Sequence, residues 1–107
     1  MKSIIQGEKE CYFCRALANR EGCFGELTHN GLHRHHIIYG AGRRKFSERY
    51  GLWIWLCPHH HNLGGMEAVH MNETLRRYTE RIAQKAFEQR GGSRQDFVEI
   101  FGRNYLD

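Results

Sequence analysis

The chain has 107 residues, which suffices for one domain with a modest core and excludes a second folded domain within this length. Hydrophobic residues make up 40%, but no apolar run approaches the roughly 20 residues that cross a bilayer, so we expect no membrane contact. Arg supplies most of the 16 basic residues and the net charge is +4, which favours nucleic acid as a partner. The same charge also suits the surface of any small protein.

Composition also bears on location and on metal binding. Ile4 and Ile5 are the only apolar pair in an N-terminal stretch where a signal peptide would need many, so we expect a cytoplasmic protein with reduced thiols. The 8 His and 4 Cys residues are numerous for this length, and most of them cluster in the sequence. This composition indicates metal binding rather than disulfides.

Local sequence predicts short strands in the middle of the chain. The first third, up to about Leu32, has no sustained period and is predicted as irregular loops around Cys11 and Cys14. Residues 32–39 and 53–56 suit two short strands. The basic segment 43–49 between them is predicted as a loop.

Helices are expected after the second strand. Pro58 is well placed as the first residue of a helix, because its missing N–H would be unused there. Gly64-Gly65 then interrupts the chain. A strand, a loop, a strand and a helix therefore occupy the middle third, and the predicted class is α+β.

The last third predicts two more helices. Asn72 is the expected N-cap of a long helix from 73 to about 90, and Ser93 opens a short helix through a capping box after Gly91-Gly92. The long helix is expected to dock through apolar residues at helical spacing: Leu75, Tyr78, Ile82, Ala86 and Phe87. Its alternating Arg and Glu residues predict an exposed face with ion pairs.

Two spaced pairs of residues predict a structural zinc site. Cys11 and Cys14 can hold zinc from one tight turn, and Cys57 and His60 have the same spacing where the next helix is expected. Together they would form a tetrahedral Cys₃His site. Such a site would stabilise the first third of the chain, which has no hydrophobic core of its own. Cys23 is left over and is expected to be a small, partly buried apolar residue.

A second group of histidines lies between and beyond these pairs. His35 and His36 are adjacent on a predicted strand, where neighbouring side chains point to opposite faces. Both can serve one site only at a strand end or a bulge. His61 follows the second pair directly, whereas His29 and His33 are expected to be surface or structural residues. The three histidines left after zinc binding favour an enzyme over a purely structural zinc module.

The histidine pattern resembles a known family. The run His35-His36-Ile37, followed after about 20 residues by Leu56-Cys57-x-x-His60-His61, resembles the ββα-metal core of HNH endonucleases. The resemblance covers about Cys11 to Asn72, including two zinc-binding pairs that enclose the active site. Small phage and prophage HNH proteins resemble the chain more closely, through further motifs in the same order: Gly40-Ala41-Gly42-Arg43-Arg44, Ser47-Glu48-Arg49-Tyr50-Gly51, Val69-His70-Met71-Asn72 and Phe101-Gly102-Arg103-Asn104-Tyr105.

This resemblance implies a fold and a metal requirement. We expect a zinc-stapled, treble-clef-like ββα-metal core over about residues 11–72, followed by C-terminal helices over about 73–105, in one domain that spans 1–107. Besides the structural Zn²⁺, the resemblance implies one catalytic divalent cation: Mg²⁺, Mn²⁺, Ni²⁺ or Zn²⁺. No small-molecule cofactor is expected.

The resemblance also implies roles for individual histidines. His35 and His61 are expected to bind the catalytic cation, and His36 is expected to be the general base. His70 is expected to add a third ligand or a phosphate contact, or to lie idle before the long helix. The chain departs from the family pattern at Leu52, where the family has an Asn that orients the base. We expect either that a backbone carbonyl, a metal-bound water or the Ser47 hydroxyl replaces this Asn, or that the activity is weakened.

Basic residues flank the proposed site and predict DNA contacts of low sequence specificity: Arg34, Arg43, Arg44, Lys45 and Arg49. The sequence thus predicts a metal-dependent HNH endonuclease that hydrolyses DNA phosphodiester bonds, of phage or prophage origin. The main alternative is a non-catalytic zinc-stabilised module that binds nucleic acid. A less favoured class is an interaction or packaging accessory protein on the same scaffold.

Overall fold

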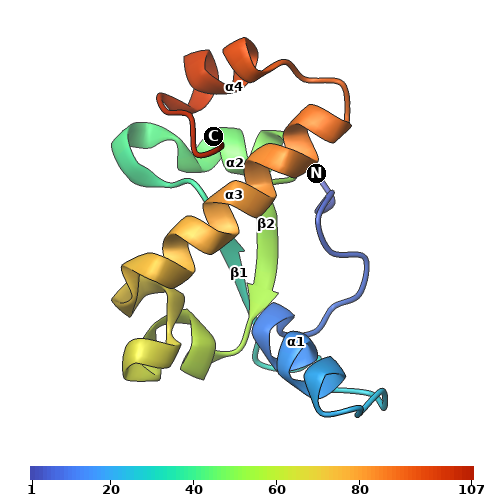
Figure 1. Cartoon of the computed structure of the whole chain (residues 1–107). Coiled ribbons are helices and arrows are strands. Elements are labelled where there is room, and N and C mark those ends of the chain that lie inside the picture. Colours follow the sequence, from blue (N-terminus) through green and yellow to red (C-terminus); the bar gives the residue numbers. More distant parts are fainter.

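The chain folds as a two-stranded antiparallel sheet with four α-helices around it (Figure 1), so the predicted α+β class is confirmed. A computed structural model describes all 107 residues. The elements in chain order are α1 (Tyr12–Arg20), β1 (His33–His36), α2 (Arg44–Arg49), β2 (Trp53–Leu56), α3 (Glu73–Gln89) and α4 (Arg94–Phe101). α3 crosses the sheet diagonally, with α1 near one end of the sheet and α4 beyond the other. None of the helices combines the length and the apolar character that a transmembrane segment requires.

The pairing of β1 with β2 places the two adjacent histidines on different faces of the sheet. His35 is opposite Ile54, and His36 is opposite Trp53. Because side chains alternate along a strand, His35 shares the buried face with Ile54 and Leu56, while His36 lies on the other face. His36 is also the last residue of β1. The strand therefore ends where both histidines can still reach one site.

The expected strand over 32–39 is shorter than predicted, and the expected loop over 43–49 is mostly helical. The buried Ser47 hydroxyl in α2 donates to the Ile38 carbonyl at 2.6 Å and accepts from the Ile38 N–H at 3.1 Å. A 3₁₀ turn at Gly40–Gly42 leads directly into α2. The loop prediction is wrong because a contact between two segments, which local sequence does not contain, stabilises this helix.

The first third is not irregular throughout, because α1 follows directly on Cys11. Cys11 is the N-cap, and its Sγ accepts a hydrogen bond from the Cys14 N–H at 3.5 Å. Ala16 and Leu17 then favour a helix by intrinsic propensity. Phe13 is buried in the core. The prediction of loops is therefore wrong over α1, since two cysteines at this spacing can also open a helix.

The helix predicted to begin at Pro58 is a single π-helical turn, His59–Leu63. The Gly64 N–H donates to the His59 carbonyl at 2.8 Å and closes this turn. Two 3₁₀ turns, Gly65–Glu67 and Val69–Met71, then carry the chain to α3. π-helical turns are rare and often occur at functional sites.

α3 begins as predicted, but its buried face is rotated. Asn72 Oδ1 accepts hydrogen bonds from the N–H groups of Thr74 and Leu75 at 2.9 and 3.3 Å. Tyr78, expected in the core, is 52% exposed. The buried face instead consists of Thr79, Glu80, Ala83, Gln84 and Phe87.

Returning C-terminal residues explain why polar side chains are buried on α3. Gln84 is fully buried, and its Oε1 accepts from the Tyr105 N–H at 2.7 Å. Its Nε2 donates to Asn104 Oδ1, also at 2.7 Å. The rotation of α3 therefore satisfies the backbone of a segment far away in the sequence, which apolar periodicity cannot reveal.

α4 closes the core as predicted. Ser93 Oγ accepts from the Asp96 N–H at 3.0 Å. The Phe97 and Phe101 rings lie 5.5 and 6.3 Å from the Phe87 ring, measured between centroids. The same core continues beneath the sheet through fully buried aliphatic side chains: Leu52, Ile54, Leu56 and Val69.

We expect Gln84→Ala to lower the free energy of unfolding by about 1–3 kcal/mol, because the half-buried Tyr105 N–H loses its acceptor and the buried amide leaves a void. Gln95→Ala is the matched control, since Gln95 is exposed on α4 and bonds only Glu99. It should change stability by less than about 0.5 kcal/mol. Denaturant unfolding measures both, and equal effects would show that Gln84 does not hold the C-terminal segment.

Candidate metal centres

Three sulfur atoms and one imidazole nitrogen converge where α1, the end of β2 and the π-helical turn meet. The ligand atoms of Cys11, Cys14, Cys57 and His60 all lie within 4.8 Å of one another. His60 Nδ1 is 3.5, 3.4 and 3.3 Å from the three Sγ atoms in that order, and the Sγ atoms of Cys14 and Cys57 are 3.9 Å apart. Cys11 and His60 are buried. The four residues form a buried potential metal site, as their spacing in the sequence predicts.

This geometry is consistent with structural zinc. At Zn–S distances of about 2.3 Å and Zn–N distances of about 2.0–2.1 Å, tetrahedral ligand atoms lie roughly 3.5–3.8 Å apart, close to the observed separations. Burial, and then the neighbouring Cys11, raise the pKa of the Cys14 thiol to about 12. Clustered thiolates here therefore need a cation to balance their charge. Cys23 is exposed and outside the cluster, so its expected partial burial is wrong.

A second cluster joins three histidines from three segments. His35 lies on β1, His61 in the π-helical turn and His70 in the last 3₁₀ turn before α3. Their ring nitrogens lie within 4.8 Å of one another, and the Nε2 atoms of His61 and His70 are 3.1 Å apart. Two nitrogen ligands about 2.1 Å from one ion lie roughly 3.0–3.4 Å apart. The donor set therefore fits a divalent cation, and His70 belongs to it.

Burial keeps these imidazoles uncharged. It lowers the pKa of His35 to about 3, with further lowering by the neighbouring histidines. It lowers the pKa of His61 to about 4, and it also lowers the pKa of His70, where the Arg76 charge adds to the effect. Neutral imidazole is the form that binds a metal ion. The fold therefore presents three lone pairs at neutral pH.

His33 supports the second cluster, a role that the sequence analysis missed. Its Nδ1 lies 2.9 Å from Nδ1 of His61. In the tautomer in which His61 Nδ1–H donates to His33, the Nε2 of His61 is left free to bind a metal. The signal was present in the sequence, because His33 and His35 are two residues apart on one strand and share a face.

His36 lies between a carboxylate and a guanidinium. Its Nε2 is 2.9 Å from Glu48 Oε1, and its Nδ1 accepts from Arg44 Nε at 3.2 Å. Since Nδ1 accepts, Nε2 carries the proton and donates to Glu48. The hydrogen bonds from His36 and Arg34 hold the pKa of Glu48 at about 2. Glu48 therefore stays ionised and fixes the ring of His36.

Neither a backbone carbonyl nor the Ser47 hydroxyl, two of the substitutes expected for the missing Asn, bonds the His36 ring. Leu52 is buried in the core, and its carbonyl accepts from Ile37 N–H at 3.1 Å instead. Ser47 uses its hydroxyl on Ile38. The side chain that bonds the His36 ring on this side is Glu48, next to Ser47, for which the sequence predicted no such contact. The sequence signal was weak, since only the path of α2 brings this carboxylate to β1.

The histidines and two arginines open into one cavity of about 290 Å³, lined by Arg34, His35, His36, Tyr39, Arg44, His61 and His70. Both adjacent histidines of β1 reach it, as a strand end allows. Arg34 also pairs with Glu48 at 2.8 Å and stacks on Trp53, with the guanidinium carbon 3.9 Å from the ring centroid. Arg44 contacts His36 directly, through its Nε.

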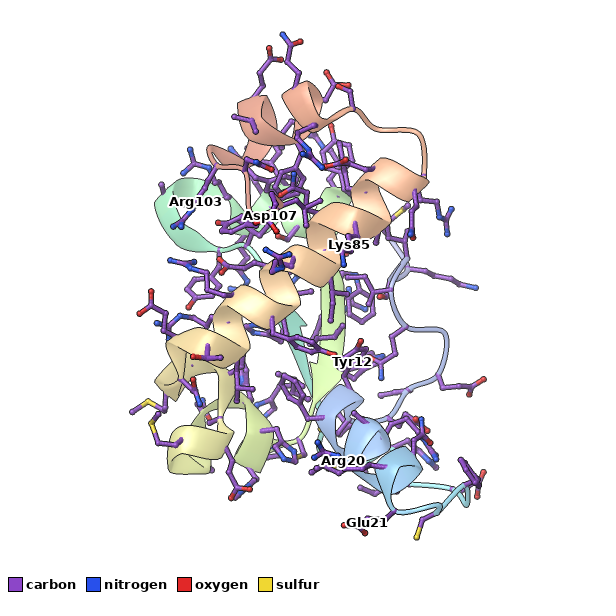
Figure 2. The ribbon with its side chains drawn as sticks, viewed as in Figure 1. Tyr12, Arg20, Glu21, Lys85, Arg103 and Asp107 are labelled. Carbon is purple, nitrogen blue, oxygen red and sulfur yellow. The ribbon has the colours of Figure 1, made fainter.

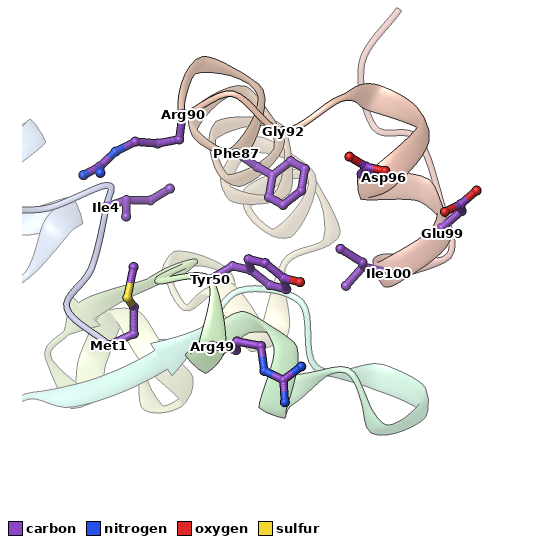
Figure 3. Close-up of a pocket in the computed structure, with 10 residues that line it drawn as sticks. All are labelled: Met1, Ile4, Arg49, Tyr50, Phe87, Arg90, Gly92, Asp96, Glu99 and Ile100. Carbon is purple, nitrogen blue, oxygen red and sulfur yellow. The ribbon is translucent and has the colours of Figure 1, made fainter.

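The other predicted DNA-binding residues are dispersed. Arg43 lines a neighbouring cavity, and Lys45 is exposed above the Phe46 ring. Arg49 lies at a larger cavity, of about 560 Å³, whose lining includes the aromatic rings of Tyr50 and Phe87 (Figure 3). No histidine or cysteine lines that cavity. The three arginines of the basic segment, Arg43, Arg44 and Arg49, therefore line three different cavities.

We expect Cys14→Ser to reduce bound zinc from about one ion per chain to nearly none, and to lower the melting temperature by more than about 10 °C. Cys23→Ser is the matched control, because Cys23 is exposed and outside the cluster. It should keep the zinc content and the melting temperature of the parent. Elemental analysis and thermal melts check both, and a zinc-free protein that melts cooperatively would contradict the assignment.

No model of a protein family, no curated protein and no solved structure matches the chain. The resemblance to HNH endonucleases therefore stays a prediction from the sequence motifs. What the structure itself establishes is an α+β fold with a buried Cys/His site consistent with zinc.

Proposed function

We propose that this protein is a metal-dependent endonuclease of the HNH type, with a ββα-metal core, that hydrolyses DNA phosphodiester bonds. One observation carries the proposal: three uncharged, clustered imidazoles and a fourth histidine paired with a carboxylate open into the same cavity. A structural zinc module needs only its four ligands. The additional histidines are arranged as a hydrolytic site requires.

His36 is the general base in this proposal. Its Nε2–H donates to Glu48, so Nδ1 is the atom that accepts a proton from the attacking water once Arg44 has moved away. Glu48 stabilises the imidazolium that results, as a carboxylate does for histidine in other hydrolases. Arg44 donates to the same Nδ1 in this structure and gives up that bond when it contacts a phosphate.

In this proposal His35, His61 and His70 would hold the divalent cation. A bound ion would supply Lewis acidity toward the phosphate oxygens as negative charge develops on them. The three imidazoles are positioned by separate segments, and His33 orients His61 through their 2.9 Å contact. Such support behind a metal ligand fixes the ring and raises its basicity.

Arg34 and Arg44 supply positive charge at the cavity for the DNA backbone. Contacts of this kind bind phosphates of any sequence and weaken as salt increases. Helix α2, which carries most of the basic segment, has only six residues, and its Ser47 bonds Ile38 in the segment that follows β1. A helix of fewer than two turns presents few side chains to base edges, which supports low sequence specificity.

We expect His36→Ala to lower plasmid nicking by about 10² to 10⁴-fold while the fold, the zinc and binding of the catalytic ion persist. His35→Ala and His61→Ala should instead weaken binding of the ion, so part of their lost activity returns at high Mn²⁺. His29→Ala is the control, since His29 is exposed outside both clusters. Nicking is titrated against Mn²⁺ for each variant, with thermal melts as a folding check.

The same assay discriminates the alternatives. Full nicking by His36→Ala, or its rescue by saturating metal, would assign the base to another residue. A wild-type protein that binds DNA but does not nick it with Mg²⁺, Mn²⁺, Ni²⁺ or Zn²⁺ would be a zinc-stabilised binding module. A protein that does neither would fit the accessory class.

A second expectation concerns Glu48 as a positioning residue. Glu48→Ala should lower nicking by about 10 to 100-fold, the usual effect of removing a group that orients a functional histidine. Glu48→Asp should recover part of this loss, and Glu26→Ala is a control at an exposed carboxylate. The ¹⁵N shifts of His36 report the tautomer, which should change in Glu48→Ala. Unchanged shifts together with unchanged nicking would remove Glu48 from the proposal.

A further inference from the structure

A second cavity lies directly beside the histidine cavity. It measures about 400 Å³, and Tyr39 lines both cavities. The Tyr39 ring lies 5.0 Å from the His70 ring, centroid to centroid, so this side chain forms the wall between them. The second cavity is thus one side chain away from the proposed metal ligands.

Three arginines from three separate segments line this second cavity: Arg43 before α2, Arg76 on α3 and Arg103 after α4. None of them has a carboxylate within 4.0 Å, whereas five other arginines of the chain do. Glu80 is the acidic residue of the cavity, and it is already paired with Arg77 at 2.7 Å. The cavity therefore carries a net positive charge without a counter-ion from the protein.

Arg43 is held in place at this cavity with an unused donor. Its Nε is buried and has no hydrogen-bond partner. Its guanidinium packs on Gly102, where an added Cβ would lie 2.5 Å from Nη2, and Gly102 has a φ of +83°. The buried Nε anchors the Arg43 guanidinium in the protein, while its two Nη groups have no hydrogen-bond partner and are not enclosed, so they can donate to an anionic oxygen.

Arg76 connects this cavity with the metal cluster. Its Nη1 donates to the His70 carbonyl at 3.0 Å. The sequence analysis assigned the charges of α3 to an exposed face with ion pairs, and for Arg76 that assignment is wrong. The residue is half-buried and links α3 to the turn that carries a proposed metal ligand.

We propose that Arg43, Arg76 and Arg103 form a binding site for a second phosphate of the DNA strand, next to the phosphate that reacts in the histidine cavity. The inference rests on the proposed function, because DNA is its ligand. Guanidinium groups match phosphate oxygens in shape and can bind them through paired hydrogen bonds. A site that grips the neighbouring phosphate would fix the register of the strand at the metal cluster.

The test is DNA binding by the zinc-loaded, full-length protein without added catalytic metal. Arg43→Gln with Arg103→Gln should lower affinity for a short fluorescent duplex by at least about tenfold, and should reduce the slope of log affinity against log salt concentration by about 0.9 in total, because both arginines contact the same phosphate. Arg20→Gln removes the same charge from the exposed end of α1, far from Arg103 (Figure 2). It should bind as the parent does. Thermal melts and zinc content confirm that each variant is folded.

A direct readout is the NMR signal of the Arg43 Nε–H, which burial protects from exchange with solvent. The duplex should shift this signal in the parent protein, and the shift should be smaller in Arg103→Gln. Inorganic phosphate is titrated in parallel. A signal that moves with inorganic phosphate but not with DNA would identify a site for free anions and overturn the assignment to the DNA backbone.

The outcomes separate this inference from the proposed function. If the arginine variants bind DNA with the affinity and salt dependence of Arg20→Gln while the parent nicks plasmid, the phosphate site is wrong and the nuclease stands. If the parent does not nick but the arginine pair weakens binding as expected, the phosphate site stands and the nuclease is wrong. A parent protein that does not bind DNA overturns both.

Discussion

The π-helical turn His59–Leu63 is the constraint on which both clusters depend. Its consecutive residues His60 and His61 serve different sites, because His60 faces the three sulfur atoms and His61 faces His35 and His70. Gly64 makes this possible, since a Cβ there would collide with the His59 carbonyl that closes the turn. A metal ion at the Cys/His site would hold the turn against α1 and β2. By holding His60 it would also position His61, so a structural ion would support the second cluster.

The end of β1 supplies the second constraint. Side chains alternate between the two faces of the strand, so His35 is buried and uncharged while the adjacent His36 pairs with a carboxylate. Burial suppresses protonation of His35, and Glu48 holds the ring of His36 through an ionised partner. Two environments thus give the same kind of side chain two different states, an uncharged imidazole and an imidazole bonded to an ionised carboxylate.

Charge on the arginines is organised rather than spread over the surface. Arg34 is neutralised by Glu48 and stacked on Trp53, so much of its charge is already used within the protein. Arg43, Arg76 and Arg103 are free of carboxylates and meet at a single cavity. The net charge of +4 therefore says less about the partner than this local imbalance does. Folding brings unpaired cations together next to the histidines.

Local sequence was sufficient wherever a feature depends on neighbours in the chain. The spacing of Cys11, Cys14, Cys57 and His60 identified the residues that converge, β2 has the predicted bounds, and the caps Asn72 and Ser93 begin α3 and α4 as expected. Tertiary structure decided what depends on contacts between distant segments. The hydrogen bonds between Ser47 and Ile38 stabilise α2, and the hydrogen bond from Tyr105 to Gln84 sets which face of α3 is buried. Glu48 reaches His36 only because α2 packs on β1. The spacing of metal ligands and the caps of helices depend on residues close together in the chain, so they can be read from the sequence. The partner of a buried polar group depends on how the whole chain folds.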